Sequence, residues 1–354
     1  MDNVKIIETR KNKIIKSKKM NCIFDKENGF TIIWGETFDD DPEYSPFGPL
    51  LLDIEISSIC SRACEFCYKS NGTYKGKNML FETFKILFDK FPKETLTQIA
   101  FGIGDIDANP DLWKIMEYCR ENGVIPNITI NGERMTSKYY DKLVGLCGAV
   151  AVSLYDKDTC YNAVKELTDR GLKQVNIHSL LAQQTYSQCL EVLSDRETEE
   201  RLNALNAIVY LWLKPKGINN HFHQVGKGQF ENLVNKAIAS NTNFGFDSCS
   251  APMFLEITKS RKEYERLKIV VESCESFGIF SGYINVEGAY FPCSFAEGVG
   301  EWESGLDVLN CKDFLEDIWF HPLVNKYRRK SIAKTDENGC RKCLIYNLAL
   351  KEEK

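Results

Sequence analysis

Three cysteines that stand close together could hold a metal cluster. Cys60, Cys64 and Cys67 occur as Cys-Ser-Arg-Ala-Cys-Glu-Phe-Cys. Cysteine thiolates are the usual protein ligands of iron–sulfur clusters, and three of them at these spacings can wrap one face of a four-iron cube. One iron of the cube would then be open to bind another molecule. The alternative is that three buried thiols meet by chance in one loop.

A second set of cysteines lies near the C-terminal end. Cys293 follows Cys274 after 18 residues, and Cys340-Arg-Lys-Cys343 follows after 46 more. Four such thiolates can close a tetrahedral site around one iron–sulfur cluster or one zinc ion. Cys249 competes with Cys274 for this site, and it is also a candidate catalytic residue that would face the substrate. We expect Cys274 to be the ligand, because its distance along the chain to Cys293 fits better. Two buried thiols plus an accidental pair remain the alternative.

Composition excludes several classes of protein. The 354 residues include 14 cysteines and are 43% hydrophobic, which is enough apolar material for a large core. The chain shows no secretory signal and no apolar run long enough for a membrane span, so we expect a cytoplasmic protein that has reduced thiols and no membrane partner. A net charge of −5 argues against a dedicated nucleic-acid binder.

Six short apolar runs alternate with helical patterns in the first two thirds of the chain, which predicts parallel strands joined by helices. Six units are too few for a closed eight-unit barrel. We therefore expect an α/β fold, a partial (β/α)6 TIM-like barrel, with its active site where the strands end. The expected strands are residues 50–56, 98–101, 128–130, 149–154, 175–179 and 207–213.

The pattern changes near residue 250. A long helical stretch over 255–276 precedes two alternating segments in 282–292 that predict a β-hairpin about Glu287-Gly288. The first 20 residues carry seven Lys or Arg against two acids, which favours a solvated basic hairpin. The expected organisation is an N-terminal extension (1–48), the barrel (49–250) and a cluster-binding domain of hairpin and helix (251–354).

The N-terminal cysteine motif, with Phe66 before the third cysteine, resembles that of the radical S-adenosylmethionine (SAM) superfamily. The resemblance covers about residues 50–250. It implies that Cys60, Cys64 and Cys67 bind a [4Fe–4S] cluster, that SAM binds the open iron, and that reductive cleavage of SAM yields a 5′-deoxyadenosyl radical.

The same resemblance suggests residues that contact SAM. The superfamily has a Gly-Gly-Glu-Pro-like turn after the second strand, where this chain has Gly102-Ile103-Gly104-Asp105, with Asp in place of Glu and no Pro. Asn131, Ser153 and His178 follow or lie on later strands at positions where relatives contact the methionine or ribose. Strand-end turns are the alternative for Asn131 and Ser153, and a core position is the alternative for His178.

The C-terminal set resembles a twitch domain, the shorter relative of the SPASM domain. Gly288, with four residues between it and Cys293, matches the opening of that pattern, and the later cysteines of a full SPASM pattern are missing. The resemblance implies one auxiliary [4Fe–4S] cluster.

Enzymes with this pair of domains mostly resemble maturases of ribosomally made peptides. We therefore expect a radical SAM oxidoreductase that oxidatively modifies a peptide or protein side chain, supplied with electrons by a flavodoxin- or ferredoxin-type reductant. The alternatives are a radical SAM dehydrogenase of a small molecule or nucleotide, and a non-catalytic iron–sulfur electron carrier. A pure carrier would normally ligate every iron with thiolates, which the three-cysteine motif does not do.

Overall fold

The computed structural model describes residues 4–37, 40–73, 76–269 and 271–350. The ends of the expected first and last domains, residues 1–3 and 351–354, lie outside the described residues. The strands are β1 (Lys5–Glu8), β2 (Asn12–Lys16), β3 (Asn21–Asp25), β4 (Thr31–Trp34), β5 (Leu51–Glu55), β6 (Gln98–Gly102), β7 (Ile125–Ile130), β8 (Val150–Ser153), β9 (Val175–Leu181), β10 (Ala207–Trp212), β11 (Phe244–Phe246), β12 (Ser281–Ile284), β13 (Ala289–Phe291) and β14 (Leu306–Asp307). The α-helices are α1 (Phe81–Lys90), α2 (Leu112–Glu121), α3 (Ser137–Leu146), α4 (Lys157–Asp169), α5 (Tyr186–Thr198), α6 (Lys227–Ala239), α7 (Ala251–Thr258), α8 (Tyr264–Ile269) and α9 (Pro322–Ile332).

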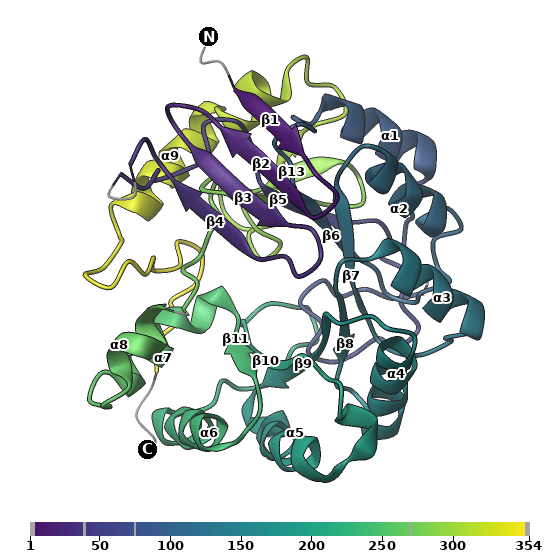
Figure 1. The fold of residues 1–354 in the computed structure, drawn as a ribbon, viewed down its shortest axis with the longest axis vertical. Coiled ribbons are helices and arrows are strands. Elements are labelled where there is room, and N and C mark those ends of the chain that lie inside the picture. The colour runs from purple at the N-terminus through teal and green to yellow at the C-terminus, as the bar shows by residue number, and fades with distance from the viewer. Residues whose placement is uncertain (1–3, 38–39, 74–75, 270, 351–354) are drawn as a thin grey trace.

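A curved parallel sheet forms the centre of the molecule. Strands β5 to β10 pair in sequence order and in parallel, and they are the six strands that the sequence predicts; β11 adds a seventh beside β10. Helices α1 to α6 follow one another along the outside of this sheet (Figure 1). The predicted α/β fold with an open, partial barrel is confirmed.

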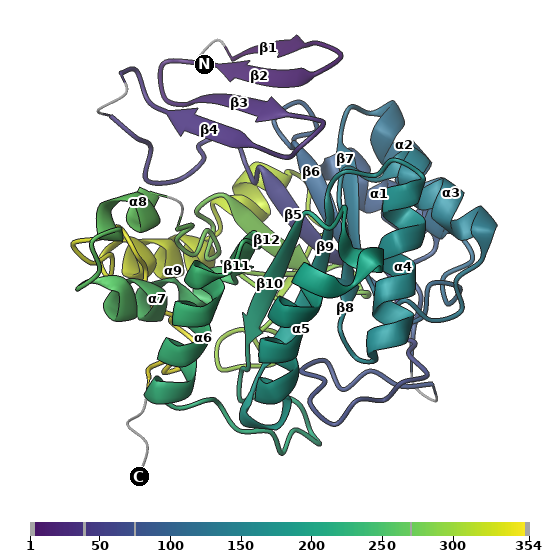
Figure 2. The same ribbon diagram turned by 60° about the horizontal axis from the view of Figure 1, so that its bottom comes forward.

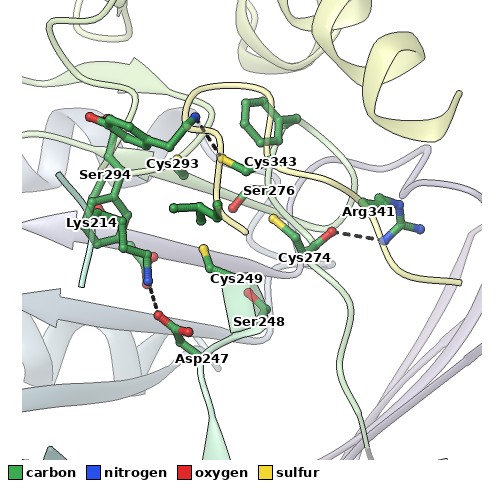
Figure 3. Close-up of a pocket in the computed structure, with 15 residues that line it drawn as sticks. Lys214, Asp247, Ser248, Cys249, Cys274, Ser276, Cys293, Ser294, Arg341 and Cys343 are labelled. Carbon is green, nitrogen blue, oxygen red and sulfur yellow. Dashed lines mark hydrogen bonds and ion pairs between the residues drawn. The ribbon is translucent and has the colours of Figure 1, made fainter. Parts of the chain in front are cut away.

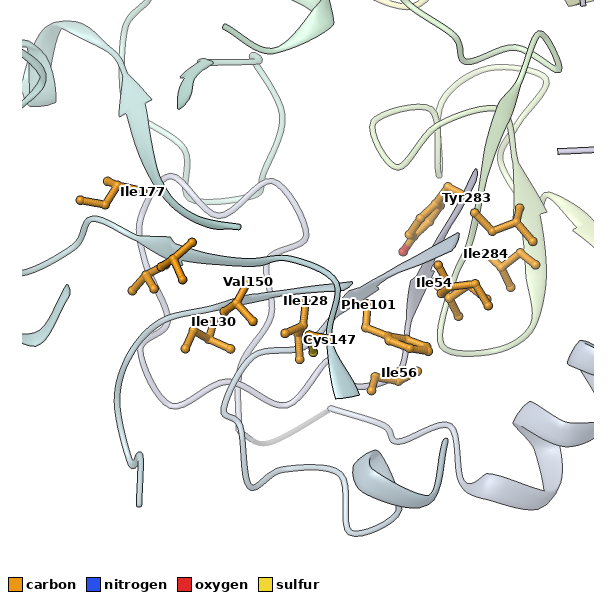
Figure 4. Close-up of a cluster of buried hydrophobic side chains, with 14 of the residues drawn as sticks. Ile54, Ile56, Phe101, Ile128, Ile130, Cys147, Val150, Ile177, Tyr283 and Ile284 are labelled. Atoms are coloured by element: carbon orange, nitrogen blue, oxygen red, sulfur yellow. The ribbon is translucent and has the colours of Figure 1, made fainter. Parts of the chain in front are cut away.

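Alternation along the strands separates a helix-packed face from an inner face. In β9 the side chains of Val175, Ile177 and Leu181 are buried, whereas Asn176 and His178 between them are partly exposed. Figure 4 shows the apolar side chains, including Ile128 and Ile177, gathered along the sheet. Burial of one face leaves the other to carry polar groups.

The C-terminal hairpin extends the same sheet. The expected pair of strands is present as β12 and β13, and β12 pairs in parallel with β5. Tyr283 on β12 stands opposite Asp53 on β5. The barrel and the extension therefore share one ten-stranded sheet, in which β14 is the last strand.

The expected long helix over 255–276 is wrong. The structure has two shorter helices, α7 and α8, separated by a turn, and residues 271–276 are not helical. The buried hydroxyl of Thr258 donates to the carbonyl of Phe254 at 2.8 Å, and Arg261 N donates back to Thr258 O. Such local hydrogen bonds compete with continuation of a helix. Cys274 consequently lies outside any helix, in a segment without regular secondary structure.

The basic hairpin expected in the first 20 residues is present as β1 and β2, and β3 and β4 extend it to a four-stranded antiparallel sheet, but the hairpin is not wholly solvated. Lys13 is 1% exposed, and its ammonium donates to the carbonyls of Lys93 and Leu96, which precede β6. These contacts join the small sheet to the edge where the parallel strands begin (Figure 2). The opposite edge, where the strands end, is left to the cysteine loop.

Candidate metal and cofactor sites

The three N-terminal cysteines lie in the loop that follows β5. Cys60, Cys64 and Cys67 are all partly exposed, and Cys67 N donates to Cys64 O at 3.1 Å. Ala63 adopts a left-handed conformation (φ 46°), which turns the chain between the first two cysteines. Burial raises the pKa of Tyr155 to about 12, with smaller contributions from the negative charges of the three thiols. The thiols thus lie in one loop beside Tyr155, at the carboxyl edge of the sheet.

The turn after β6 packs directly against this loop. A Cβ on Gly104 would stand 2.1 Å from Ile59 O and 2.5 Å from Cys60 Cβ, so only glycine fits there. Asp105 is 3% exposed and accepts hydrogen bonds from Ser61 N at 2.9 Å and from Ser61 Oγ at 3.0 Å. In this structure Asp105 therefore binds the cysteine loop itself.

The other residues expected to contact SAM lie around the same edge. Gly102 ends β6, and Asn131 follows β7 and donates to Gly104 O at 3.2 Å. Ser153 on β8 stands opposite His178 on β9, and burial lowers the pKa of His178 to about 4. The Phe66 ring lies 5.1 Å from Phe222 and 5.8 Å from Tyr155, between centroids. The contacts that these residues would make with SAM stay a prediction.

Four other cysteines line a single cavity of about 170 Å³. Cys249 comes from the turn after β11, Cys274 from the irregular segment after α8, Cys293 from the chain after β13, and Cys343 from the C-terminal tail. Figure 3 shows their four sulfur atoms turned toward the same space. Burial raises the pKa of Cys293 to about 12, helped by the nearby charges of Cys274 and Cys343. The cavity thus disfavours free thiolates, which a bound metal would stabilise.

Cys340 is oriented differently. Its side chain is buried, with 2% exposed. Of the seven thiols expected to bind metal, it alone lies outside both the N-terminal loop and the cavity lining, among the residues that the structure describes. Its backbone N–H donates to Asp336 Oδ1 at 3.0 Å, in a tight turn closed by Gly339. Cys249 takes the place in the cavity that the sequence analysis gave to Cys340.

A buried ion pair stands beside the four thiols. Lys214, in the chain after β10, pairs with Asp247, and their side chains are 3% and 18% exposed. Ser250 Oγ donates to Asp247 Oδ1 at 2.5 Å, and the ammonium lies 5.0 Å from the centroid of the Phe295 ring. The pair supplies fixed charges at the edge of the cavity. The sequence analysis missed it, although a lysine directly after a buried strand is a signal that could have suggested it.

The donor sets fit iron–sulfur clusters. Three thiols in one loop and four around one cavity are the ligands such clusters use, and thiolate-only sets are also compatible with zinc. No group of three or more His, Cys, Asp or Glu side chains, among the residues that the structure describes, is gathered closely enough to hold a single metal ion.

Part of the barrel matches a known family and known relatives. Residues 54–178 match the radical SAM superfamily model. The mycofactocin maturase MftC of Mycolicibacterium smegmatis is 23% identical over 155 residues, which cover 40% of each chain. A tungsten-containing aldehyde ferredoxin oxidoreductase cofactor-modifying protein of Pyrococcus furiosus is 32% identical over 99 residues, or 27% of each chain. The chain thus aligns with less than half the length of these relatives.

The fold is similar to solved structures along nearly the whole chain. Streptococcus suis SuiB superposes with a TM-score of 0.68 at 15% identity, covering 91% of this chain and 90% of SuiB. SuiB bound to its precursor peptide SuiA gives 0.67 at 16% identity, covering 88% of both chains. None of the helices among the described residues is long and apolar enough to span a membrane. The superfamily match over residues 54–178 and the three-cysteine loop at the carboxyl edge of the sheet support a radical SAM enzyme, and the cofactors that the superfamily uses are a [4Fe–4S] cluster and SAM.

Proposed function

We propose that this protein is a radical SAM enzyme that oxidatively modifies a side chain of a peptide or protein. Cys60, Cys64 and Cys67 would hold the cluster that binds SAM. The observation that carries the oxidative part of the proposal is the cavity lined by four thiols where the extension meets the end of the barrel. When bound, these groups supply a 5′-deoxyadenosyl radical that takes a hydrogen atom from the substrate, and an acceptor for the electron that the substrate radical gives up.

The auxiliary cluster would be held by Cys249, Cys274, Cys293 and Cys343. This set exchanges Cys340 for Cys249, because the four thiols that line the cavity form a complete set of ligands. A fully ligated cluster has no open iron for SAM, which suits a role in electron transfer. Cys249 then serves as a ligand rather than as a catalytic residue that faces the substrate.

The side chains around the N-terminal loop would keep it fixed. Asp105 accepts both hydrogen bonds that Ser61 offers, and Arg62 pairs with Glu133 while its guanidinium lies 4.6 Å from the centroid of the Tyr155 ring. A loop bound on both sides loses little freedom when its ligands are occupied, which favours a preorganised site.

A peptide substrate is favoured over a small molecule by the similarity in fold. SuiB, which superposes over most of the chain, was solved with a precursor peptide, and MftC is named as a maturase. The Pyrococcus furiosus relative is a cofactor-modifying protein, and it favours the second candidate, oxidation of a small molecule. The two candidates share the same two clusters.

Iron analysis and SAM cleavage test the proposal. Protein reconstituted without oxygen should contain about eight irons per chain, and it should convert SAM to 5′-deoxyadenosine when a reductant is added. Changing Cys60, Cys64 and Cys67 together to Ala should remove about four irons and abolish cleavage. Zinc in either site, or no cleavage by the intact protein, would contradict the proposed function.

Single cysteine variants distinguish the two possible ligand sets. Cys249→Ala should lower the iron content by up to about four per chain, and it should leave reductive cleavage of SAM in place. Cys340→Ala is the matched control and should keep the full iron content. The reverse result would restore Cys340 to the set.

Substrate class can be tested with synthetic peptides encoded by short reading frames next to the gene. Incubation with SAM and reductant should give a product lighter by two hydrogens, detectable by mass spectrometry. Oxidation of small alcohols or nucleotides, with no peptide modified, would favour the second candidate.

A further inference from the structure

Lys69 connects the N-terminal cysteine loop to the C-terminal extension. It lies two residues after Cys67, and its side chain is 12% exposed. The ammonium is 3.1 Å from Glu55 Oε2 at the end of β5, and it also pairs with Glu297 in the chain after Cys293. Its Nζ donates to Tyr283 Oη on β12 at 2.7 Å. One cation therefore joins three separate segments.

The two acids at this junction have further partners. Glu55 is 5% exposed and also accepts from Tyr283 Oη at 3.2 Å, and Glu297 Oε1 accepts from Asn285 Nδ2 at 2.8 Å. Buried charges are tolerated when they are paired and hydrogen-bonded, and loss of one partner leaves the others uncompensated. Without Lys69, the carboxylates of Glu55 and Glu297 would both lose the cation that pairs with them.

A second lysine binds the same segment of the extension. Lys216, in the loop after β10, donates to the carbonyls of Ser294 at 3.2 Å and Glu297 at 2.7 Å. In the same loop a Cβ on Gly217 would stand 2.4 Å from Cys67 O, so the loop packs closely on the third cysteine. The chain after Cys293 is thus held against the N-terminal cysteine loop from two directions.

We propose that Lys69, bound between Glu55 and Glu297, is a positioning residue that fixes the distance between the two cysteine centres. The inference rests on the proposed function in one respect, that both centres hold clusters. Electron transfer depends on the separation of donor and acceptor, so a junction that fixes two loops would fix that separation. Lys69 touches neither substrate nor reacting atoms in this role.

An exposed ion pair provides a matched control. Lys77, ten residues after Cys67, pairs with Glu287 in the hairpin turn, and their side chains are 64% and 58% exposed. It joins the same two parts of the chain as Lys69 does. Solvent-exposed pairs contribute little, because water and salt screen them. Any effect specific to a buried junction should therefore appear at Lys69 and not at Lys77.

The test compares Lys69→Met, Lys69→Arg and Lys77→Met in reconstituted protein. The first readout is hydrogen exchange in peptides covering 66–71 and 294–298, and the second is magnetic coupling between the two reduced clusters. We expect Lys69→Met to speed exchange in both peptides by roughly tenfold or more and to weaken the coupling at unchanged iron content. Lys69→Arg keeps the charge, so its exchange rates in both peptides should stay within about twofold of those of the unaltered protein. The same is expected of Lys77→Met.

The outcomes separate this inference from the proposed function. Equal exchange in Lys69→Met and Lys77→Met would overturn the positioning role. Should Lys69→Met fail to fold, Glu297→Gln removes one acid and should speed exchange in 294–298 alone; no change there would also overturn the role. A single cluster in the unaltered protein would refute the proposed function and leave the exchange comparison valid.

Discussion

The carboxylate of Asp105 receives both the backbone N–H and the hydroxyl of Ser61, at 2.9 and 3.0 Å. Ser61 follows Cys60 directly, so this contact fixes the start of the cysteine loop to the turn after β6. The sequence analysis placed Asp105 in the turn where superfamily members contact SAM. In this structure its carboxylate acts on the loop that holds the first cysteine.

Replacing Asp105 with Ala should loosen the loop. Ser61 would lose the acceptor of its N–H and hydroxyl; because Ser61 is exposed, water can replace that acceptor in part, and the lost hydrogen bond costs about 0.5–1.5 kcal/mol. We expect SAM affinity to fall by roughly tenfold, measured by equilibrium dialysis against the reconstituted protein. Asp105→Asn keeps one acceptor oxygen, so it should lose less of the affinity for SAM than Asp105→Ala does.

Asp107→Ala is the control for that change. Asp107 is 39% exposed on its side chain and contacts the same Arg134 as Asp105 does. Its removal should leave SAM affinity within about twofold. If both alanine variants bind SAM equally, Asp105 has no special role in the loop.

Gly104→Ala should disrupt the N-terminal site by crowding. The new methyl group would stand 2.1 Å from Ile59 O, and backbone there must move. We expect about four fewer irons per chain after reconstitution, because Cys60 is displaced. Gly145→Ala in α3, where nothing lies within 4 Å, should keep the iron and stabilise the helix slightly.

The parallel sheet could be predicted because each strand is a local apolar run. Val150–Ser153 and Val175–Leu181 are bounded by turns and separated by helical patterns, so local sequence contains the information. The pairing of β12 with β5 could not be predicted in this way. It joins residues more than 200 positions apart, and neither strand carries a mark of its partner.

The ligand set of the second site shows the same limit. Spacing identified Cys274, Cys293 and Cys343, which do line the cavity, and Cys340, which does not; it treated Cys249 as a competitor of Cys274, whereas both line the cavity. Cys340 stands only three residues from Cys343, but the turn at Gly339 directs it away. Which of two nearby thiols faces a cavity depends on backbone geometry that spacing does not record.

His178 should make stability depend on pH below 6.5. Burial lowers its pKa to about 4, so the folded protein keeps the neutral imidazole while the unfolded chain binds a proton near pH 6.5. Protons therefore favour unfolding as the pH falls from 6.5 toward 4, and the effect vanishes above 6.5. At pH 5.5 the cost is about 1.4 kcal/mol.

The measurement is the difference in thermal midpoint between the unaltered protein and His178→Gln, at pH 7.5 and at pH 5.5. The variant should gain roughly 2–3 °C relative to the unaltered protein on acidification. A difference that does not change with pH would show that His178 is not held neutral. Other groups titrate in this range, and the comparison at each pH cancels them.

Lys214 and Asp247 should stabilise the fold as a pair. Removing one of the two charges should therefore destabilise the protein more than removing both. Lys214→Met leaves Asp247 buried with Ser250 Oγ as its remaining partner, and loss of one member of a buried pair costs about 3–5 kcal/mol. We expect the thermal midpoint to fall by roughly 5 °C or more. Lys259→Met, which breaks the exposed pair with Glu337, should change it by less than about 1 °C.

The double variant Lys214→Met, Asp247→Asn removes both charges and should recover most of the lost stability, because no charge is left unpaired. The iron content of the double variant then shows whether the ion pair also affects metal binding by the four thiols beside it. If the double variant is stable and keeps its iron, the pair stabilises the fold alone. Loss of about four irons from a stable double variant would mean that the fixed charges also help Cys249 and its neighbours hold the metal.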